Sequence, residues 1–165
     1  MPTPRFQEEG TLLLKGIDTT PSSLFVRPLT VEDAGIAAEL SSQLGYPNSC
    51  ENLRQRLEGL SRSPDRIALA AVLCGQLVGW IDAFIERHLQ STDTVVIGGL
   101  IVHDTARGLG IGKRLCYEVE QWARGKSVRS LRVRSQIVRE DAHRFYIREG
   151  YRNVKTSVVF EKNLI

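Results

Sequence analysis

The chain has 165 residues and a net charge of +3, and its composition is that of an ordinary globular protein. This length suits one domain with its own core, and the small charge argues against a nucleic-acid-binding surface, which carries a denser stripe of Lys and Arg. No apolar run approaches the roughly 20 residues of a membrane span, and the start of the chain lacks the apolar core of a signal peptide. Three scattered cysteines match no metal spacing and favour a reducing compartment. We therefore predict a cytoplasmic protein with no nucleic-acid partner, no membrane partner and no metal.

The chain divides into a short extension and one domain. Residues 1–23 mix prolines, charges and threonines, so we expect a loosely held extension with one short strand at 12–15. A single domain should span residues 24–165, without internal repeats. A late cluster of arginines is interpreted as a solvated face (Arg129, Arg132, Arg134, Arg139 and Arg144).

The domain opens with a strand and a pair of helices. Residues 24–27 predict a strand. Thr30 and Asp33 have the spacing of a capping box, so a helix is expected to begin there and to stop at Gly45. A second helix is expected after Ser49, because serine is a favoured N-cap.

Apolar patterns in the rest of the chain predict a mixed sheet with helices on both faces. The run at 94–102 is apolar at almost every position, which is typical of a strand covered on both sides. We expect strands at 67–73, 77–86, 94–102, 130–135 and 157–160, and helices after residue 110 and at 141–149. This order of elements predicts the α/β class, as an α+β mixed sheet.

A glycine-rich turn joins the strand at 94–102 to the next helix. Gly108, Gly110 and Gly112 precede or open that helix, whose first backbone N–H groups have no partner within it. Glycines let this backbone approach an anion closely, and the positive end of the helix dipole attracts one. Arg107 and Lys113 add positive charge. These features predict a pyrophosphate cradle, whereas a bare tight turn would need one glycine rather than three.

Two common phosphate-binding patterns do not fit this turn. The phosphate-loop pattern requires Ser or Thr after Gly-Lys, but the chain has Arg114 there. The dinucleotide pattern requires G-x-G-x-x-G and an acidic residue about twenty positions later, where the chain has Arg132. The pattern that does fit is [Arg/Gln]-x-x-Gly-x-[Gly/Ala], as Arg107, Gly110 and Gly112.

This stretch resembles the acetyl-CoA-binding motif of the GNAT superfamily of N-acetyltransferases. Residues 140–151 resemble the next motif of that family, a helix with A-x-x-F-Y-x-x-x-G-[F/Y]. The two motifs cover residues 94–160, and residues 24–86 are compatible with the opening elements of the family. The resemblance implies a GNAT-type fold with a central, mostly antiparallel sheet flanked by helices. It also implies acetyl transfer from acetyl-CoA to a primary amine.

The resemblance implies a set of acetyl-CoA contacts. In the family a bulge splays the strand before the turn, and Gly98-Gly99 would suit such a distortion. Leu100 and Val102 would then offer backbone groups to the pantetheine arm, and the Leu100 N–H would stabilise the oxyanion. The full set of implied contacts is Leu100, Ile101, Val102, Arg107, Gly108, Leu109, Gly110, Ile111, Gly112, Lys113, Ala142 and Tyr146.

Catalysis by proton transfer has one clear candidate and one gap. The resemblance gives Tyr146 as the acid that protonates the departing thiolate. Many family members carry a Glu late in the strand before the turn, but residues 95–99 contain no carboxylate. Asp82, Glu86 and His88 share one face of the preceding strand. We predict Glu86 as the general base, with Asp82 second; a chain of waters or a merely solvated face are the alternatives.

The acceptor is not specified by the motifs. In the family it lies against the helix pair and two loops, here residues 44–49 and 85–94. The Gly45-Tyr46-Pro47 turn resembles small-molecule relatives, so we expect an amine of a small molecule or a peptide. A second class of function is a catalytically degenerate acyl-CoA sensor, favoured by the missing Glu and disfavoured by Tyr146. The oligomeric state stays open, with a homodimer among the options.

Overall fold

The computed structural model describes residues 23–43 and 45–165, which form two compact units. The first unit extends to Arg132, and the second comprises Val133–Ile165. The predicted N-terminal extension and its short strand lie outside the described residues, except for its last residue. Leu44 also lies outside them.

A sheet forms the centre of the first unit, and its strands lie side by side in chain order. They are β1 (Leu24–Pro28), β2 (Arg66–Leu73), β3 (Gln76–His88), β4 (Ser91–Val102) and β5 (Leu131–Val133). β1 to β4 pair antiparallel. Ahead of β5, the Ser130 carbonyl accepts from the Val95 N–H at 2.9 Å. The predicted mostly antiparallel sheet is confirmed.

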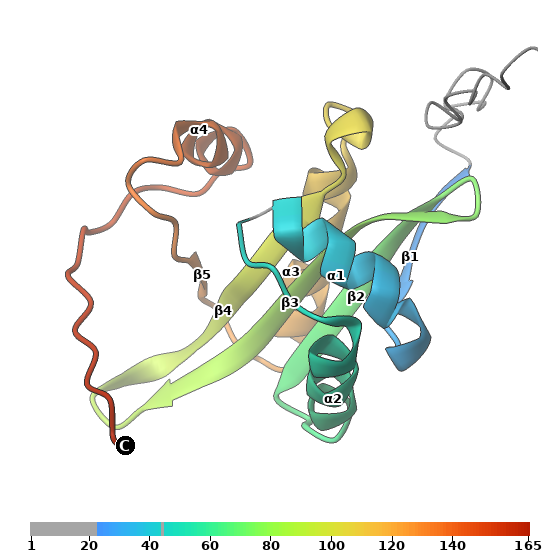
Figure 1. The fold of residues 1–165 in the computed structure, drawn as a ribbon. Helices are drawn as coiled ribbons and strands as arrows, with labels where there is room; N and C mark the ends of the chain where they lie inside the picture. Colours follow the sequence, from blue (N-terminus) through green and yellow to red (C-terminus); the bar gives the residue numbers. More distant parts are fainter. Residues whose placement is uncertain (1–22, 44) are drawn as a thin grey trace, which may run out of the picture. The chain divides into compact units, whose positions relative to one another are not determined.

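Three helices cover the two faces of this sheet (Figure 1). They are α1 (Ala34–Gln43), α2 (Cys50–Ser61) and α3 (Ile111–Gly125). Figure 1 shows α1 and α2 on one face and α3 on the other. Across the described ranges, no helix is long and apolar enough to cross a membrane.

Local capping explains where the helix pair begins. A 3-10 turn at Val31–Asp33 leads into α1, and Asp33 Oδ2 accepts from the Thr30 N–H at 2.9 Å. Ser49 Oγ accepts from the Asn52 N–H at 3.1 Å and so caps α2. Gly45, after α1, has a φ of 86°, a conformation that favours glycine. The predicted helix starts and the stop at Gly45 are confirmed.

Alternation along β3 positions the core. Ile81, Ala83 and Ile85 are buried, and alternation places their side chains on the face of β3 opposite to that of Trp80. The opposite face of β3 meets α1, where Trp80 Nε1 donates to the Ala37 carbonyl at 3.3 Å. The core cluster on this side consists of Leu40, Ala70, Leu77 and Ile101.

The second unit contains α4 (Glu140–Arg148), which confirms the last predicted helix. The strand predicted at 157–160 is wrong, because no helix or strand follows α4 in the residues that the structure describes. A strand exists through hydrogen bonds to a neighbouring strand, and within this fully described unit the only strand residue is Val133, the end of β5. The apolar side chains that gave the strand pattern are exposed (Val158, Val159 and Phe160).

Candidate active site

A β-bulge interrupts β4 at its two glycines. Asp82 of β3 pairs with Gly99, but the next residue, Ala83, pairs with Ile97. Gly98 is therefore an extra residue that opposes no partner on β3. The distortion predicted at Gly98-Gly99 is present.

Beyond the bulge, alternate residues of β4 direct their backbone groups away from β3. The His103 N–H donates to the Val78 carbonyl at 2.8 Å, so residue 103 faces β3. Backbone N–H and C=O groups alternate in direction along a strand. Those of Ile101 therefore also point toward β3, and those of Leu100 and Val102 point away from it. Leu100 and Val102 thus present their N–H and C=O groups on the side where the pantetheine arm is expected. Ile101 has a different environment, since its side chain is buried in the core cluster.

The turn before α3 is open at its glycines. Gly108 and Gly110 have φ values of 81° and 77°, and no atom lies within 4 Å of the position that a Cβ would take at either residue. The Arg114 N–H donates to the Gly110 carbonyl at 2.9 Å, as the first bond of the helix. The N–H groups of residues 111–113 therefore precede the helical ladder and carry the positive end of its dipole. This arrangement can bind a phosphate group.

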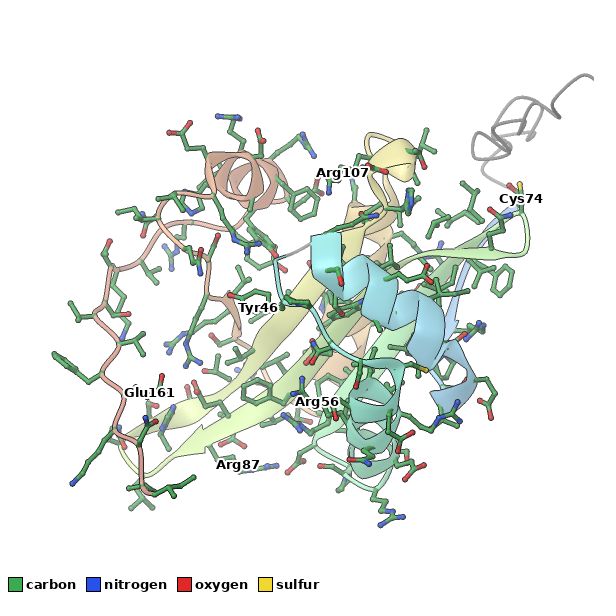
Figure 2. All side chains as sticks on the ribbon, viewed as in Figure 1. Tyr46, Arg56, Cys74, Arg87, Arg107 and Glu161 are labelled. Carbon is green, nitrogen blue, oxygen red and sulfur yellow. The ribbon has the colours of Figure 1, made fainter. Side chains whose placement is uncertain are left out.

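The side chains of the turn have distinct surroundings. Arg107 Nε donates to the Val102 carbonyl at 3.2 Å, and its exposed guanidinium lies at the turn (Figure 2). Lys113 and Leu109 are exposed, whereas Ile111 is buried and anchors the start of α3 in the core. Ile111 therefore anchors the end of the turn in the core, while the cationic side chains of Arg107 and Lys113 stay exposed.

Asp82 lies half-buried beside the bulge. Its Oδ2 is 2.5 Å from the position that a Cβ on Gly98 would take, and its Oδ1 is 3.1 Å from that on Gly99. Burial raises the pKa of Asp82 to about 6, although Arg66 and the backbone N–H of Gly99 act in the opposite direction. This carboxyl group therefore changes its charge close to neutral pH.

Glu86, the predicted base, lies on the same face of β3 but at a different level. It is four residues beyond Asp82, about 13 Å along the strand. Its register partner is Thr94, and its Oε2 is 3.1 Å from His88 Nε2. The structure thus brings Asp82, rather than Glu86, to the bulge.

α4 carries the remaining predicted residues, and it belongs to the second unit. The Tyr146 ring packs edge-on against Phe145 and Tyr151, with ring centroids 5.1 and 5.3 Å apart. Tyr146 and Ala142 are both half-buried. Within this unit, aromatic contacts hold the Tyr146 ring in place.

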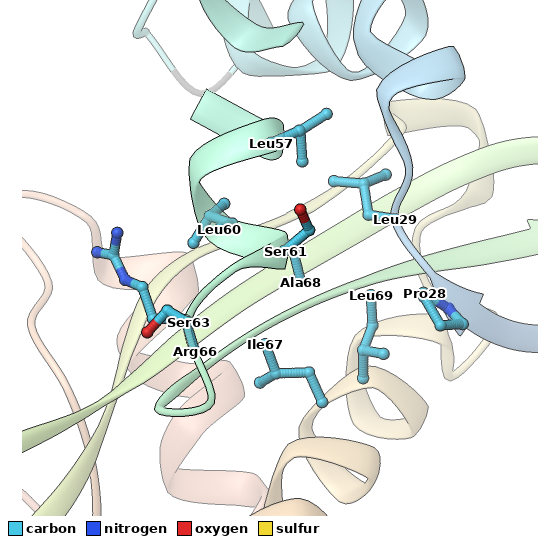
Figure 3. A pocket seen from close by; sticks show the side chains of 10 residues that line it. All are labelled: Pro28, Leu29, Leu57, Leu60, Ser61, Ser63, Arg66, Ile67, Ala68 and Leu69. Carbon is cyan, nitrogen blue, oxygen red and sulfur yellow. The ribbon is translucent and has the colours of Figure 1, made fainter. Parts of the chain in front are cut away.

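A groove of about 240 Å³ lies between the end of α2 and β2 (Figure 3). Its walls include Leu57, Leu60 and Arg66. Ala68 also lines it, and Ala68 is the register partner of Asp82. The groove therefore borders β2, which is the neighbour of the Asp82 strand on the side away from β4.

Known proteins share the sequence pattern of this chain. Residues 34–151 match the acetyltransferase (GNAT) family. The chain is 37% identical over 79 residues to the aminoalkylphosphonate N-acetyltransferase of Salmonella typhimurium, a match that spans 47% of this chain and 51% of that protein, about half its length. It is 24% identical over 143 residues to the aminoglycoside N(6')-acetyltransferase type 1 of Stenotrophomonas maltophilia, spanning 84% of this chain and 93% of that protein.

Solved structures share the fold. The aminoglycoside N-acetyltransferase AAC(6')-Iy, solved in complex with CoA, is similar with a TM-score of 0.77 and 17% identity. The similarity covers 92% of this chain and 99% of that one. It confirms the fold predicted from the two sequence motifs.

Proposed function

The chain belongs to the acetyltransferase (GNAT) family, and from this we propose that it moves an acetyl group from acetyl-CoA to a primary amine of a small molecule or peptide by direct transfer. The observation that carries the proposal is the order of features along β4: a bulge, two residues whose backbone groups face away from β3, and an open glycine turn at a helix N-terminus. Relatives named for small amine substrates support a small-molecule acceptor. The scattered cysteines favour the cytoplasm as the location.

The residues of β4 and α3 fit the parts of acetyl-CoA. The open space at Gly108 and Gly110 leaves room for the pyrophosphate above the N–H groups of residues 111–113. Arg107 and Lys113 supply charge at the edge of that space. The solved relative that holds CoA supports this donor. Acetyl-CoA supplies a reactive thioester, and this chain supplies alignment, which lowers the barrier by several kcal/mol.

Two further groups act on the reacting atoms in this proposal. The Leu100 N–H, directed away from β3, stabilises the negative charge that develops on the carbonyl oxygen. The Tyr146 hydroxyl protonates the departing sulfur. A phenol has a pKa of about 10 and a thiol of about 8.5, so full proton transfer is uphill by roughly 2 kcal/mol, which is small beside a typical barrier.

The second candidate is an acyl-CoA sensor without turnover. One observation favours it, since Thr94–Val102 of β4 contains no carboxylate to act as base. Release of free thiol from acetyl-CoA in the presence of a panel of amines separates the two candidates. Turnover with any amine supports the enzyme, and CoA binding without thiol release supports the sensor.

The donor site is tested with Gly112→Val. A valine on the first turn of α3 places methyl groups among the N–H groups of the cradle, so the dissociation constant for CoA should rise by roughly tenfold or more. Gly125→Val, at the other end of α3 with no atom within 4 Å of its Cβ position, is the control and should bind CoA normally. Calorimetric titration measures both. Unchanged CoA affinity in folded Gly112→Val protein would contradict the proposed site.

A further inference from the structure

We propose that Asp82 is the general base of the acetyl transfer and that Gly98 is the residue that makes room for it. The inference rests on the proposed function, and it names a group on β3 for a task that no side chain of Thr94–Val102 in β4 can perform. The carboxylate extends from β3 across the bulge, into space that a side chain at position 98 would otherwise occupy.

The close approach of Asp82 to the bulge carries the argument. A Cβ on Gly98 would lie 2.5 Å from Asp82 Oδ2, a separation that real Cβ atoms do not tolerate. Gly98 beside this oxygen is exposed and Asp82 is itself half-buried, so we expect an incoming amine to reach the carboxylate over Gly98. Glycine at position 98 therefore serves the neighbouring carboxylate, in addition to permitting the bulge.

The second glycine of the bulge, Gly99, allows an aromatic ring to pack beside the Asp82 carboxylate. A Cβ on Gly99 would lie 2.9 Å from the Trp80 ring, so this ring packs directly over the Gly99 backbone. Trp80 Nε1 donates to the Ala37 carbonyl of α1 at 3.3 Å, which fixes the ring. Asp82 is thereby confined between a fixed aromatic side chain and the bulge.

The charges around Asp82 leave it able to take a proton. From β2, Arg66 attracts the carboxylate, but the Arg66 guanidinium also lies over the Phe84 ring, 5.4 Å from its centroid. On β3, Glu86 lies on the same strand face as Asp82 but four residues away. On β4, the Gly99 N–H donates to the Asp82 carboxylate. Desolvation outweighs these effects, so the pKa of Asp82 rises to about 6.

Asp82 is level with the group expected to stabilise the oxyanion. Its register partner is Gly99, the residue before Leu100. Neighbouring strands lie about 4.8 Å apart, so an amine held over the bulge can meet both the carboxylate and a thioester placed at the Leu100 N–H. Glu86 is about 13 Å from this point along the strand.

The proton balance of the step is complete. The Asp82 carboxylate takes a proton from the acceptor ammonium and leaves a neutral amine. The amine nitrogen bonds to the acetyl carbon, and the carbon–sulfur bond then breaks. The sulfur ends as a thiol with a proton from Tyr146, which regains one from the new amide nitrogen. Asp82 later releases its proton to water.

The test is the pH profile of kcat/KM for Asp82→Asn, compared with that of Glu86→Gln, which removes the rival base on the same strand face; loss of the acid limb in Glu86→Gln instead would overturn the proposal. Wild-type turnover is measured first and decides the proposed function independently. We expect wild-type kcat/KM to fall below about pH 6. In Asp82→Asn it should fall roughly a hundredfold at pH 7.5 and lose that acid limb, while Glu86→Gln keeps the wild-type profile. Asn still accepts a hydrogen bond from the Gly99 N–H, so a purely structural aspartate would leave the profile unchanged.

Two more measurements sharpen the result. The exchange variant Asp82→Gly with Gly98→Asp returns a carboxylate to the same space from the opposite strand, and recovery of activity over Asp82→Gly alone supports the proposal. A wild-type profile that is flat from pH 8 to pH 5 overturns it without any variant. Retention of the wild-type acid limb in Asp82→Asn also overturns it.

Discussion

Two aspartates of the first unit show how differently one carboxyl group can be used. Asp33, between β1 and α1, is almost buried and accepts two hydrogen bonds from Arg27, at 2.6 and 2.8 Å, and a third from the Thr30 N–H. The hydrogen bonds from Arg27 hold the pKa of Asp33 below its usual value. Asp82, at the bulge, has its pKa raised by burial. The same side chain is stabilised as an anion at one place and destabilised as an anion at the other.

The difference follows from what surrounds each group. At the junction of β1 and α1, the Asp33 carboxylate accepts hydrogen bonds from a guanidinium and from the backbone at a helix start, so its ionisation stabilises the fold. The bulge offers two backbone N–H groups, those of Gly99 and of Asp82 itself, and an arginine that also contacts an aromatic ring. A carboxylate kept in this state costs stability but can accept a proton near neutral pH, which is typical of functional positions. The two regions therefore predict opposite responses to substitution.

The largest expected effect is on rate, at the proposed acid. Tyr146→Phe removes a hydroxyl and keeps the ring that packs against Phe145 and Tyr151. Turnover should fall roughly ten- to a thousandfold, with a smaller change in KM for acetyl-CoA and little change in the thermal midpoint. Steady-state kinetics and a thermal melt measure this. Full turnover in the Phe variant would leave Tyr146 as a packing residue.

Asp33→Asn should produce the largest loss of stability. It removes the charge that Arg27 and the Thr30 N–H stabilise, and the free energy of unfolding should fall by about 3 kcal/mol at pH 7, somewhat less than for a fully buried pair because Arg27 is 37% exposed. The pKa of Asp33 is lowered in the folded state, so this stabilisation exists above the unfolded pKa and is lost as pH falls through the folded one. Urea unfolding should show a large difference in the free energy of unfolding between wild type and Asp33→Asn at pH 7, and a small difference at pH 3. Equal differences at both values would contradict the role of ionisation.

Asp82→Asn should change stability in the opposite direction. The folded pKa of about 6 exceeds the usual 3.8, so wild-type stability falls as pH rises between these values. The full shift corresponds to at most about 3 kcal/mol, and partial exposure reduces it, so we expect the variant to be more stable by about 2 kcal/mol at pH 8. The difference should disappear below about pH 4. An Asn variant that is less stable at pH 8 would place Asp82 in the same class as Asp33.

The sequence predicts much of the fold because its signals are local. Thr30, Asp33 and Ser49 form caps with their near neighbours, and Gly98-Gly99 marks the bulge by itself. The strand predicted at 157–160 failed because a strand also requires a partner, and an apolar run does not identify one.

The position of Asp82 was less accessible to sequence reasoning than the glycine turn. The turn is contiguous, so its residues and their spacing can be read together. Asp82 and Gly98 are on different strands, and only the register of β3 against β4 brings them within contact. The one available signal was the combination of a carboxylate on β3 with a stretch of β4, Thr94–Val102, that has none, and it led to Glu86 ahead of Asp82. Asp82 differs from Glu86 because the register between β3 and β4 shifts beside Asp82 at Gly98, and this register depends on how the two strands pair in the folded protein.

The smallest effect concerns the turn itself and compares the glycine that precedes α3 with a glycine inside α2. Gly110, the N-cap of α3, has a φ of 77°, and nothing lies within 4 Å of its Cβ position, so Gly110→Ala should lower the free energy of unfolding by about 1 kcal/mol through backbone strain alone. Gly59 lies inside α2 with equally open space, and Gly59→Ala should raise it by about 0.5–1 kcal/mol because alanine favours a helix. Gly110→Asn should destabilise less than Gly110→Ala, since asparagine tolerates a left-handed backbone.

Gly110→Ala and Gly59→Ala also distinguish the effect of backbone strain on stability from an effect on CoA binding. The methyl group that Gly110→Ala introduces would extend into the open space expected to hold pyrophosphate, so CoA affinity should fall in this variant and stay constant in Gly59→Ala. If CoA affinity is unchanged while stability falls, Gly110 serves the turn alone, like Gly45 after α1. If both fall, the turn belongs with Asp82 in the functional region, where backbone and side chains are held in states that the fold by itself does not favour.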